Sequence, residues 1–70
     1  MKPYIVQLEI DDRKSIVYCK DGTIYKGMCI GDCIVTKDDG EDEDGVRYQT
    51  DDGYEVLLID DDIKYVKFID

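Results

Sequence analysis

The sequence predicts an all-β domain, a small barrel of five to six short, strongly bent antiparallel strands. Its 70 residues include nine Ile, six Val and six Tyr but only three Leu and no Ala. β-Branched and aromatic side chains favour strands, whereas Ala and Leu favour helices. The apolar runs are short, and Asp-Gly or Asp-rich turns separate them. The length suits one domain only, so residues 1–70 are predicted to form a single small barrel.

The first apolar segment, residues 4–10, is expected to be a strand. Its apolar residues alternate with mostly a strand period, although Tyr4, Ile5 and Leu8 would also line one face of a helix. Its β-branched and aromatic side chains favour the strand.

Three further strands are predicted before the middle of the chain. Asp21-Gly22 is a dipeptide typical of the type I′ hairpin turn. Gly27 indicates a bulge or a sharp bend inside a strand. We therefore expect Gly22 and Gly27 to be structural glycines. The predicted strands cover residues 15–20, 23–30 and 33–37, and a kink at Gly31-Asp32 separates the last two.

The second half is predicted to contain three strands separated by acidic turns. An acidic loop covers residues 38–45, and two shorter acidic turns follow it at residues 51–53 and 60–62. The predicted strands are residues 46–50, 54–59 and 63–69.

The last predicted strand carries apolar side chains on both faces. In strand alternation, Ile63, Tyr65 and Ile69 fall on one face, and Val66 and Phe68 fall on the other. A small domain covers one face only, so we expect a second chain to cover the other. The predicted oligomer interface is Tyr65, Val66, Phe68 and Ile69.

The net charge of −9 argues against a strongly basic nucleic-acid groove and against a basic membrane-surface helix. This charge is uneven: residues 1–37 hold six basic and five acidic groups, and residues 38–70 hold three and thirteen. No run reaches the roughly 18 apolar residues of a transmembrane helix, and the first ten residues lack a signal-peptide core. We therefore expect a cytoplasmic protein with no membrane partner.

The acidic loop has two interpretations. Charge runs most often form solvated turns that keep a small barrel soluble. Alternatively, the loop faces a partner, and its candidate contact residues are Asp38, Asp39, Glu41, Asp42, Glu43 and Asp44.

The residue types predict neither an enzyme nor a cofactor or metal site. The chain has no His and a single Ser, so it lacks the parts of a nucleophilic triad. Cys29 and Cys33 lie four residues apart without further zinc ligands. The acidic loop fits no EF-hand, because Gly40 stands at the first ligand position when Gly45 is aligned with the invariant glycine. Three cysteines are an odd number, which favours packed thiols over disulfides.

Residues 15–69 resemble the Sm, LSm and Hfq family of small β-barrels. A strand at residues 15–20 leads to Gly22 in a hairpin, and Gly27 follows five residues later, as in the first Sm motif. Residues 57–66 are similar to the second motif, an apolar strand, a tight turn and a final short strand. The resemblance implies a five-stranded barrel and a ring-shaped oligomer.

The residues of the family's RNA site are not present in this chain. The family places an Asn in its RNA pocket, and this chain contains no Asn. The family also has Arg-Gly in the last turn, where this chain has Asp60-Asp61. An anion in place of a cation reverses the interaction with phosphate.

We weigh three functions on this basis. The first is a non-enzymatic Sm-like interaction protein that assembles into a homo-oligomer, for example a ring. The second is an RNA-binding ring with a face made by Lys20, Lys26 and Lys37. The third is an acidic mimic of nucleic acid that binds a basic protein.

Overall fold

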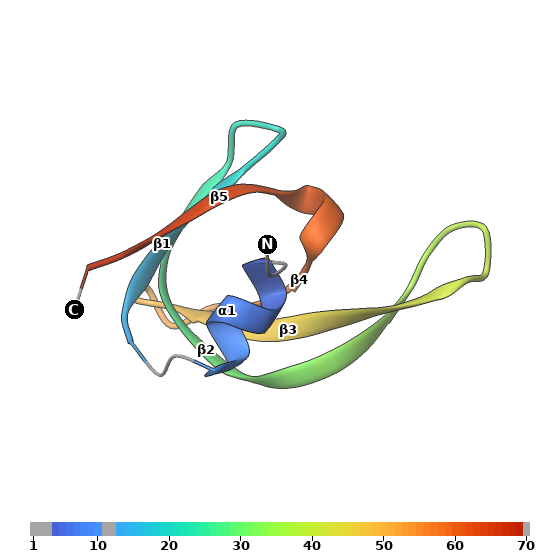
Figure 1. Ribbon diagram of the computed structural model, residues 1–70, viewed down its shortest axis with the longest axis horizontal. Coiled ribbons are helices and arrows are strands. Elements are labelled where there is room, and N and C mark those ends of the chain that lie inside the picture. The colour runs from blue at the N-terminus through green and yellow to red at the C-terminus, as the bar shows by residue number, and fades with distance from the viewer. Residues whose placement is uncertain (1–3, 11–12, 70) are drawn as a thin grey trace.

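The computed structural model describes residues 4–10 and 13–69. One antiparallel sheet of five strands, in the order β4-β3-β2-β1-β5, bends into a barrel-like shape (Figure 1). The predicted small all-β fold is confirmed, with five strands. In chain order the elements are α1 (Tyr4–Ile10), β1 (Ser15–Cys19), β2 (Ile24–Thr36), β3 (Asp42–Thr50), β4 (Glu55–Ile59), the 3-10 turn η1 (Asp60–Asp62) and β5 (Ile63–Phe68).

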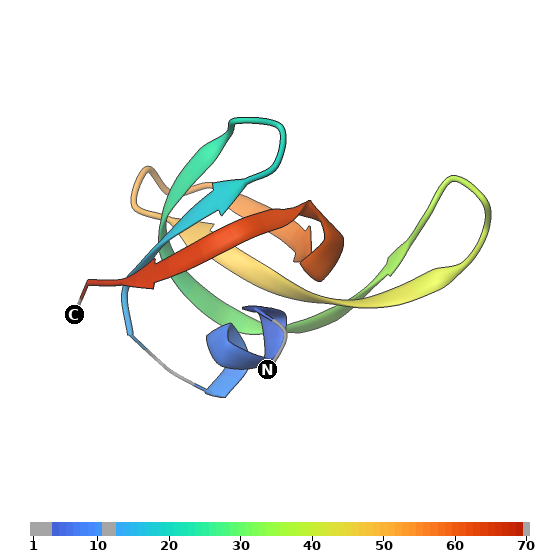
Figure 2. The same cartoon turned by 45° about the horizontal axis from the view of Figure 1, so that its top comes forward.

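The prediction of a strand at residues 4–10 is wrong, because this segment forms the helix α1. Ile5 and Leu8, three residues apart, are its buried side chains, whereas Ile10 is 65% exposed. A helix of seven residues is unstable alone, so its contacts with the core stabilise it. α1 packs against β2, β3 and β5 and lies across one open end of the bent sheet (Figure 2).

Three hairpins of the sheet use the same tight turn. The amides of Gly22, Gly40 and Gly53 each donate to the carbonyl three residues earlier, at 3.1, 2.9 and 3.0 Å. Each glycine has a φ of +85° to +93°, a conformation that strains other residues. A type I′ turn needs two positive φ values, and no described residue other than glycine has one. The type I′ prediction at Asp21-Gly22 is therefore wrong.

An aspartate precedes each of these glycines, and two of these aspartates accept hydrogen bonds that stabilise their turns. Asp21 Oδ1 accepts a hydrogen bond from the Thr23 amide at 2.9 Å, and Asp39 Oδ1 accepts one from the Glu41 amide at 3.0 Å. The bond from Thr23 lowers the pKa of the Asp21 carboxyl. Some of the acidic residues of the chain therefore serve to stabilise turns.

The long strand β2 joins what the sequence divided into two strands. Its pairing with β3 shifts register between Cys29 and Gly31, so the irregularity lies at Ile30. Gly27 lies in β2 directly opposite Thr50 of β3. The acidic loop is also shorter than predicted, because Asp42–Asp44 already belong to β3.

The core lies between the inner face of the sheet and α1. Its buried members come from α1 and from every strand except the long β2: Ile5, Leu8, Val17, Cys19, Val46, Tyr48, Leu58 and Ile63. Tyr48 is 0% exposed, and its hydroxyl donates to the Ser15 carbonyl at 2.9 Å. The Ser15 hydroxyl lies 3.1 Å from the hydroxyl oxygen of Tyr48.

Strand β5 does not present its faces as simple alternation predicts. Its pairing with β1 shifts register between Tyr18 and Cys19, which places Ile63 opposite the buried Cys19 and Val66 opposite the buried Val17. Ile63 therefore shares the inner side with Val66 and Phe68, which also pack on the core. The prediction that Ile63 and Val66 lie on opposite faces is wrong.

The turn between β4 and β5 holds the start of α1. Asp60 Oδ1 accepts a hydrogen bond from the Tyr4 amide at 2.6 Å, across 56 residues of sequence. The first amides of a helix have no partner within the helix, so this carboxylate acts as a cap. The final acidic turn is therefore partly structural.

We expect Asp60→Ala to destabilise the protein by about 1 kcal/mol, the usual cost of a lost helix cap. Amide exchange should accelerate most in α1. Asp62→Ala is the matched control, because its side chain makes no hydrogen bond or ion pair with the described residues. Equal effects of the two variants on α1 exchange would contradict the capping role.

Candidate interaction surfaces

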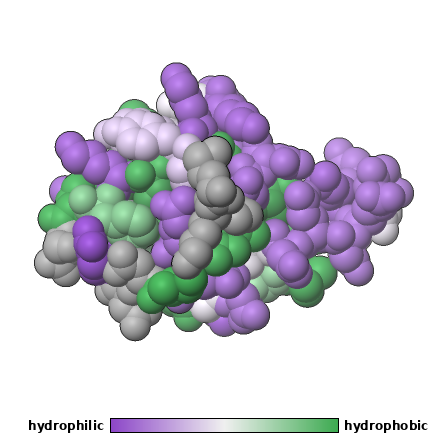
Figure 3. All heavy atoms as spheres, viewed as in Figure 1, coloured by the Kyte–Doolittle hydropathy of each residue, from purple (hydrophilic) through white to green (hydrophobic). Residues whose placement is uncertain are grey.

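The acidic loop lies on a hairpin that projects from the body of the molecule in both ribbon views (Figures 1 and 2). We call residues 37–44 the acidic hairpin; it contains Lys37 and six carboxylates. Hydrophilic residues gather over this projection in Figure 3. The six predicted partner-facing residues therefore share one projecting element. Five of them are exposed and Glu43 is half-buried.

Lys37 connects the acidic hairpin to η1. Its ammonium lies 3.0 Å from Glu43 and 3.6 Å from Asp61. The hydrogen bond to Glu43 raises the pKa of Lys37. Lys37 thus offsets part of the repulsion between the two acidic segments.

The three lysines predicted to form an RNA face are dispersed. Lys37 contacts carboxylates at the acidic hairpin. Lys20 lines a cavity of about 290 Å³ with Asp61 and Asp62. Lys26 lies in β2 opposite Ile16, on the outer side of the sheet. A single chain therefore does not bring them together.

A different group of cations lies on β1 and β5. We call residues 13–20 and 63–69 the basic ribbon; they hold five basic residues and no acidic one, namely Arg13, Lys14, Lys20, Lys64 and Lys67. β1 and β5 are neighbours in the sheet, so these residues share one side of the barrel although 42 residues separate the two segments. The sequence alone gave no sign of this group, because its members are far apart along the chain.

The outer face of the basic ribbon carries a pair of stacked tyrosines. Val17 is fully buried, so Ile16 and Tyr18 on either side of it point outward. Tyr18 is opposite Tyr65, and their rings stack with centroids 4.7 Å apart. The next outer pair is Ile16 and Lys67. This face thus carries the tyrosine pair, Ile16 and the cation of Lys67.

The predicted interface residues divide between the core and the surface. Val66 and Phe68 are half-buried and pack on the core, and the Arg13 guanidinium lies 5.0 Å from the Phe68 ring centroid. Tyr65 and Ile69 remain 42% and 41% exposed. Leu57 of β4 is 54% exposed, and sequence reasoning did not single it out.

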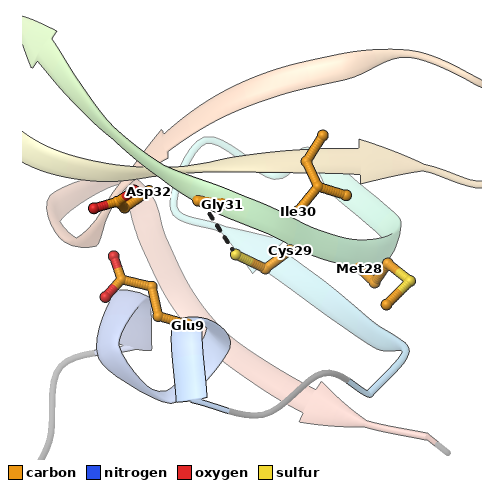
Figure 4. A pocket seen from close by; sticks show the side chains of 6 residues that line it. All are labelled: Glu9, Met28, Cys29, Ile30, Gly31 and Asp32. Carbon is orange, nitrogen blue, oxygen red and sulfur yellow. Dashed lines mark hydrogen bonds between the residues drawn. The ribbon is translucent and has the colours of Figure 1, made fainter.

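A cleft of about 500 Å³ lies between α1 and β2 (Figure 4). Glu9 of α1 and Asp32 of β2 face each other across it, and the Cys29 thiol donates to the Gly31 carbonyl at 3.3 Å. Two carboxylates without a third ligand do not make a metal site. Over residues 4–10 and 13–69, no group of three or more His, Cys, Asp or Glu is placed to hold a metal ion.

None of the three cysteines, all within the described residues, forms a disulfide. Cys19 is buried, and burial together with Asp21 and Asp62 raises the pKa of its thiol, which lowers its reactivity. Cys29 and Cys33 are half-buried on β2.

No protein-family model, curated protein or solved structure matches this chain. Within the described part of the chain, the one helix is far too short to cross a membrane.

Proposed function

We propose that this protein is a non-enzymatic, Sm-like small-barrel interaction protein that assembles with copies of itself through the two edges of its sheet. The observation that carries the proposal is the strand order β4-β3-β2-β1-β5. Among the described strands, β4 pairs only with β3, and β5 pairs only with β1. Each edge therefore presents unpaired backbone groups to another chain.

The two edges differ from each other, which favours head-to-tail assembly. Joining β5 of one copy to β4 of the next leaves one edge free at each end, and a rotation that closes the series gives a ring. Exposed apolar side chains lie on both edges, Leu57 on β4 and Tyr65 on β5. Their burial between copies would stabilise the assembly.

The resemblance of residues 15–69 to Sm-type barrels supports this proposal. A helix before the barrel belongs to the family pattern, and α1 provides one here. The family's RNA chemistry has less support. Asp60, in the place of the family's Arg, accepts the hydrogen bond from Tyr4 instead of offering a cation. The proposed activity is therefore protein–protein assembly.

A second candidate function comes from the acidic hairpin. Its six carboxylates project from the body, where they would meet a cationic surface of another protein. This arrangement favours a basic partner over a nucleic acid, because phosphates and carboxylates repel each other.

The edge contact predicts a specific mutational result. Leu57→Lys and, separately, Tyr65→Lys should raise the dissociation constant of the oligomer by about tenfold or more, because an unpaired charge at an apolar contact is costly. Native mass spectrometry and sedimentation velocity measure the distribution of species.

The matched control is Ile10→Lys. Ile10 is 65% exposed, but it lies in the helix α1 and not on an edge strand of the sheet. This variant should assemble as the native protein does. A native chain that stays monomeric at high micromolar concentration, or a control that dissociates as strongly as Leu57→Lys, would contradict edge assembly.

A further inference from the structure

We propose that the acidic hairpin of one copy docks on the basic ribbon of a second copy. This contact deepens the second candidate function, on which it rests, by naming the cationic surface. Both contacts use β5, but this one uses no residue of β4, so a substitution in β4 separates the two in an experiment.

The charges of the two elements are complementary. The acidic hairpin has a net charge of −5, from six carboxylates and Lys37. The basic ribbon has a net charge of +5. The chain as a whole carries −9, so two neighbouring segments without an acidic residue are the exception in this protein, although Lys14 forms an ion pair with Asp51 at 3.4 Å. Opposite local charges orient two surfaces and select between partners.

The tip of the acidic hairpin and the far end of the basic ribbon lie apart in one chain, although Lys37 at the base of the hairpin contacts Asp61, just before the ribbon begins. The molecule extends over 36 × 27 × 22 Å, and the acidic hairpin projects at one end of the long axis, while β5 ends near the other (Figures 1 and 2). No ion pair joins them within the described part of the chain. Lys64 and Lys67 are exposed and have no carboxylate within ion-pair distance there. The contact therefore requires a second molecule.

The two elements also offer apolar surface to each other. Ile34, beside the acidic hairpin on β2, is 61% exposed and lies opposite Asp44. The stacked rings of Tyr18 and Tyr65 lie on the outer face of the basic ribbon. A docked hairpin would place its carboxylates on the lysines while Ile34 covers part of the tyrosine pair. Such apolar burial adds to a contact whose charges mainly provide specificity.

Two charge-reversed variants test the contact. The ribbon variant is Lys64→Glu/Lys67→Glu, and the hairpin variant is Asp38→Lys/Glu41→Lys. All four side chains are exposed and make no hydrogen bond or ion pair with the described residues, so circular dichroism should show native folds. Both variants also carry Leu57→Lys, which removes the proposed edge contact from the measurement.

Each variant alone should lose self-association, and an equimolar mixture should recover it. Only the mixture combines an unaltered ribbon, from the hairpin variant, with an unaltered hairpin, from the ribbon variant. We expect a one-to-one complex that binds at least about tenfold more tightly than either variant binds itself. Sedimentation velocity and fluorescence anisotropy of the labelled hairpin variant measure the two equilibria.

Net charge alone predicts a different pattern. The hairpin variant is less negative than the native chain, so general repulsion would make it self-associate more strongly. That result, or a mixture that associates no better than its components, would overturn the proposal. Binding of a fluorescent oligothymidylate by the native ribbon, without rescue in the mixture, would overturn it in favour of a nucleic acid. Loss of edge assembly would leave the rescue unchanged, so the two proposals fail separately.

Discussion

Gly27→Ala should destabilise the protein by at least about 3 kcal/mol, because the added methyl group has no space. A Cβ at this position would lie 1.9 Å from the Gln49 carbonyl oxygen and 2.8 Å from the Thr50 Cα. Both are backbone atoms of β3, so relieving the overlap would separate β2 from β3. A domain of this size has a total stability of only about 5 kcal/mol, so much of the variant should be unfolded. Urea unfolding measures the loss.

Gly31→Ala is the matched control for Gly27→Ala. Gly31 lies in the same strand, has no positive φ, and a Cβ there would meet no atom within 4 Å. Its stability should stay within about 0.5 kcal/mol of the native value. Equal losses in the two variants would show that strand propensity, and not the close approach of β3, makes Gly27 necessary.

Tyr48→Phe should cost about 2 kcal/mol, because it leaves polar groups in the core without their partner. The Tyr48 hydroxyl donates to the Ser15 carbonyl at 2.9 Å and lies 3.1 Å from the Ser15 hydroxyl, and both residues are 0% exposed. Adding Ser15→Ala removes one of the unpaired groups, so the double variant should recover part of the loss. Simple additivity in urea unfolding would contradict this coupling.

The same phenol should make the native protein less stable in alkali. Burial raises the pKa of Tyr48 above its ordinary value of 10.0. The unfolded chain therefore releases this proton at a lower pH than the folded chain does. Its contribution to stability is complete below pH 10 and is lost as the pH rises toward the higher folded pKa. Tyr48→Phe should show a shallower alkaline decline, while Cys19, whose pKa is also raised, titrates in both proteins.

Local signals in the sequence predicted the sheet well. The three Gly residues that end tight turns, and the β-branched runs between them, locate every strand to within a few residues, apart from the division of β2 and the later start of β3. The prediction of a type I′ turn was wrong because the type I′ turn and the observed turn both have a glycine with a positive φ at residue 22. The Asp-Gly dipeptide therefore does not distinguish the two turns. Gly27 was recognised as special, but the carbonyl that excludes its side chain belongs to a distant strand.

The local sequence pattern did not predict the helix α1 or which side chains of β5 face the core. The apolar residues of segment 4–10 fit both the strand period and the helix period. Burial of Ile5 and Leu8, together with the cap from Asp60, stabilises the helix over the strand. The inner position of Val66 results from a register shift against β1, and a shift in pairing leaves no local mark on β5 itself.

The sequence by itself determined an acidic, strand-rich chain whose turns lie at Asp-Gly steps, because turn chemistry and β-propensity act between near neighbours. The tertiary structure alone decided how the charges are grouped. Lys64 and Lys67 join Arg13 and Lys14 only because β1 and β5 pair across the sheet. The six carboxylates of the acidic hairpin stand apart only because β2 and β3 continue beyond the barrel. Strand pairing brings together residues that are distant in sequence, and for that reason the interaction surfaces emerge only in the folded chain.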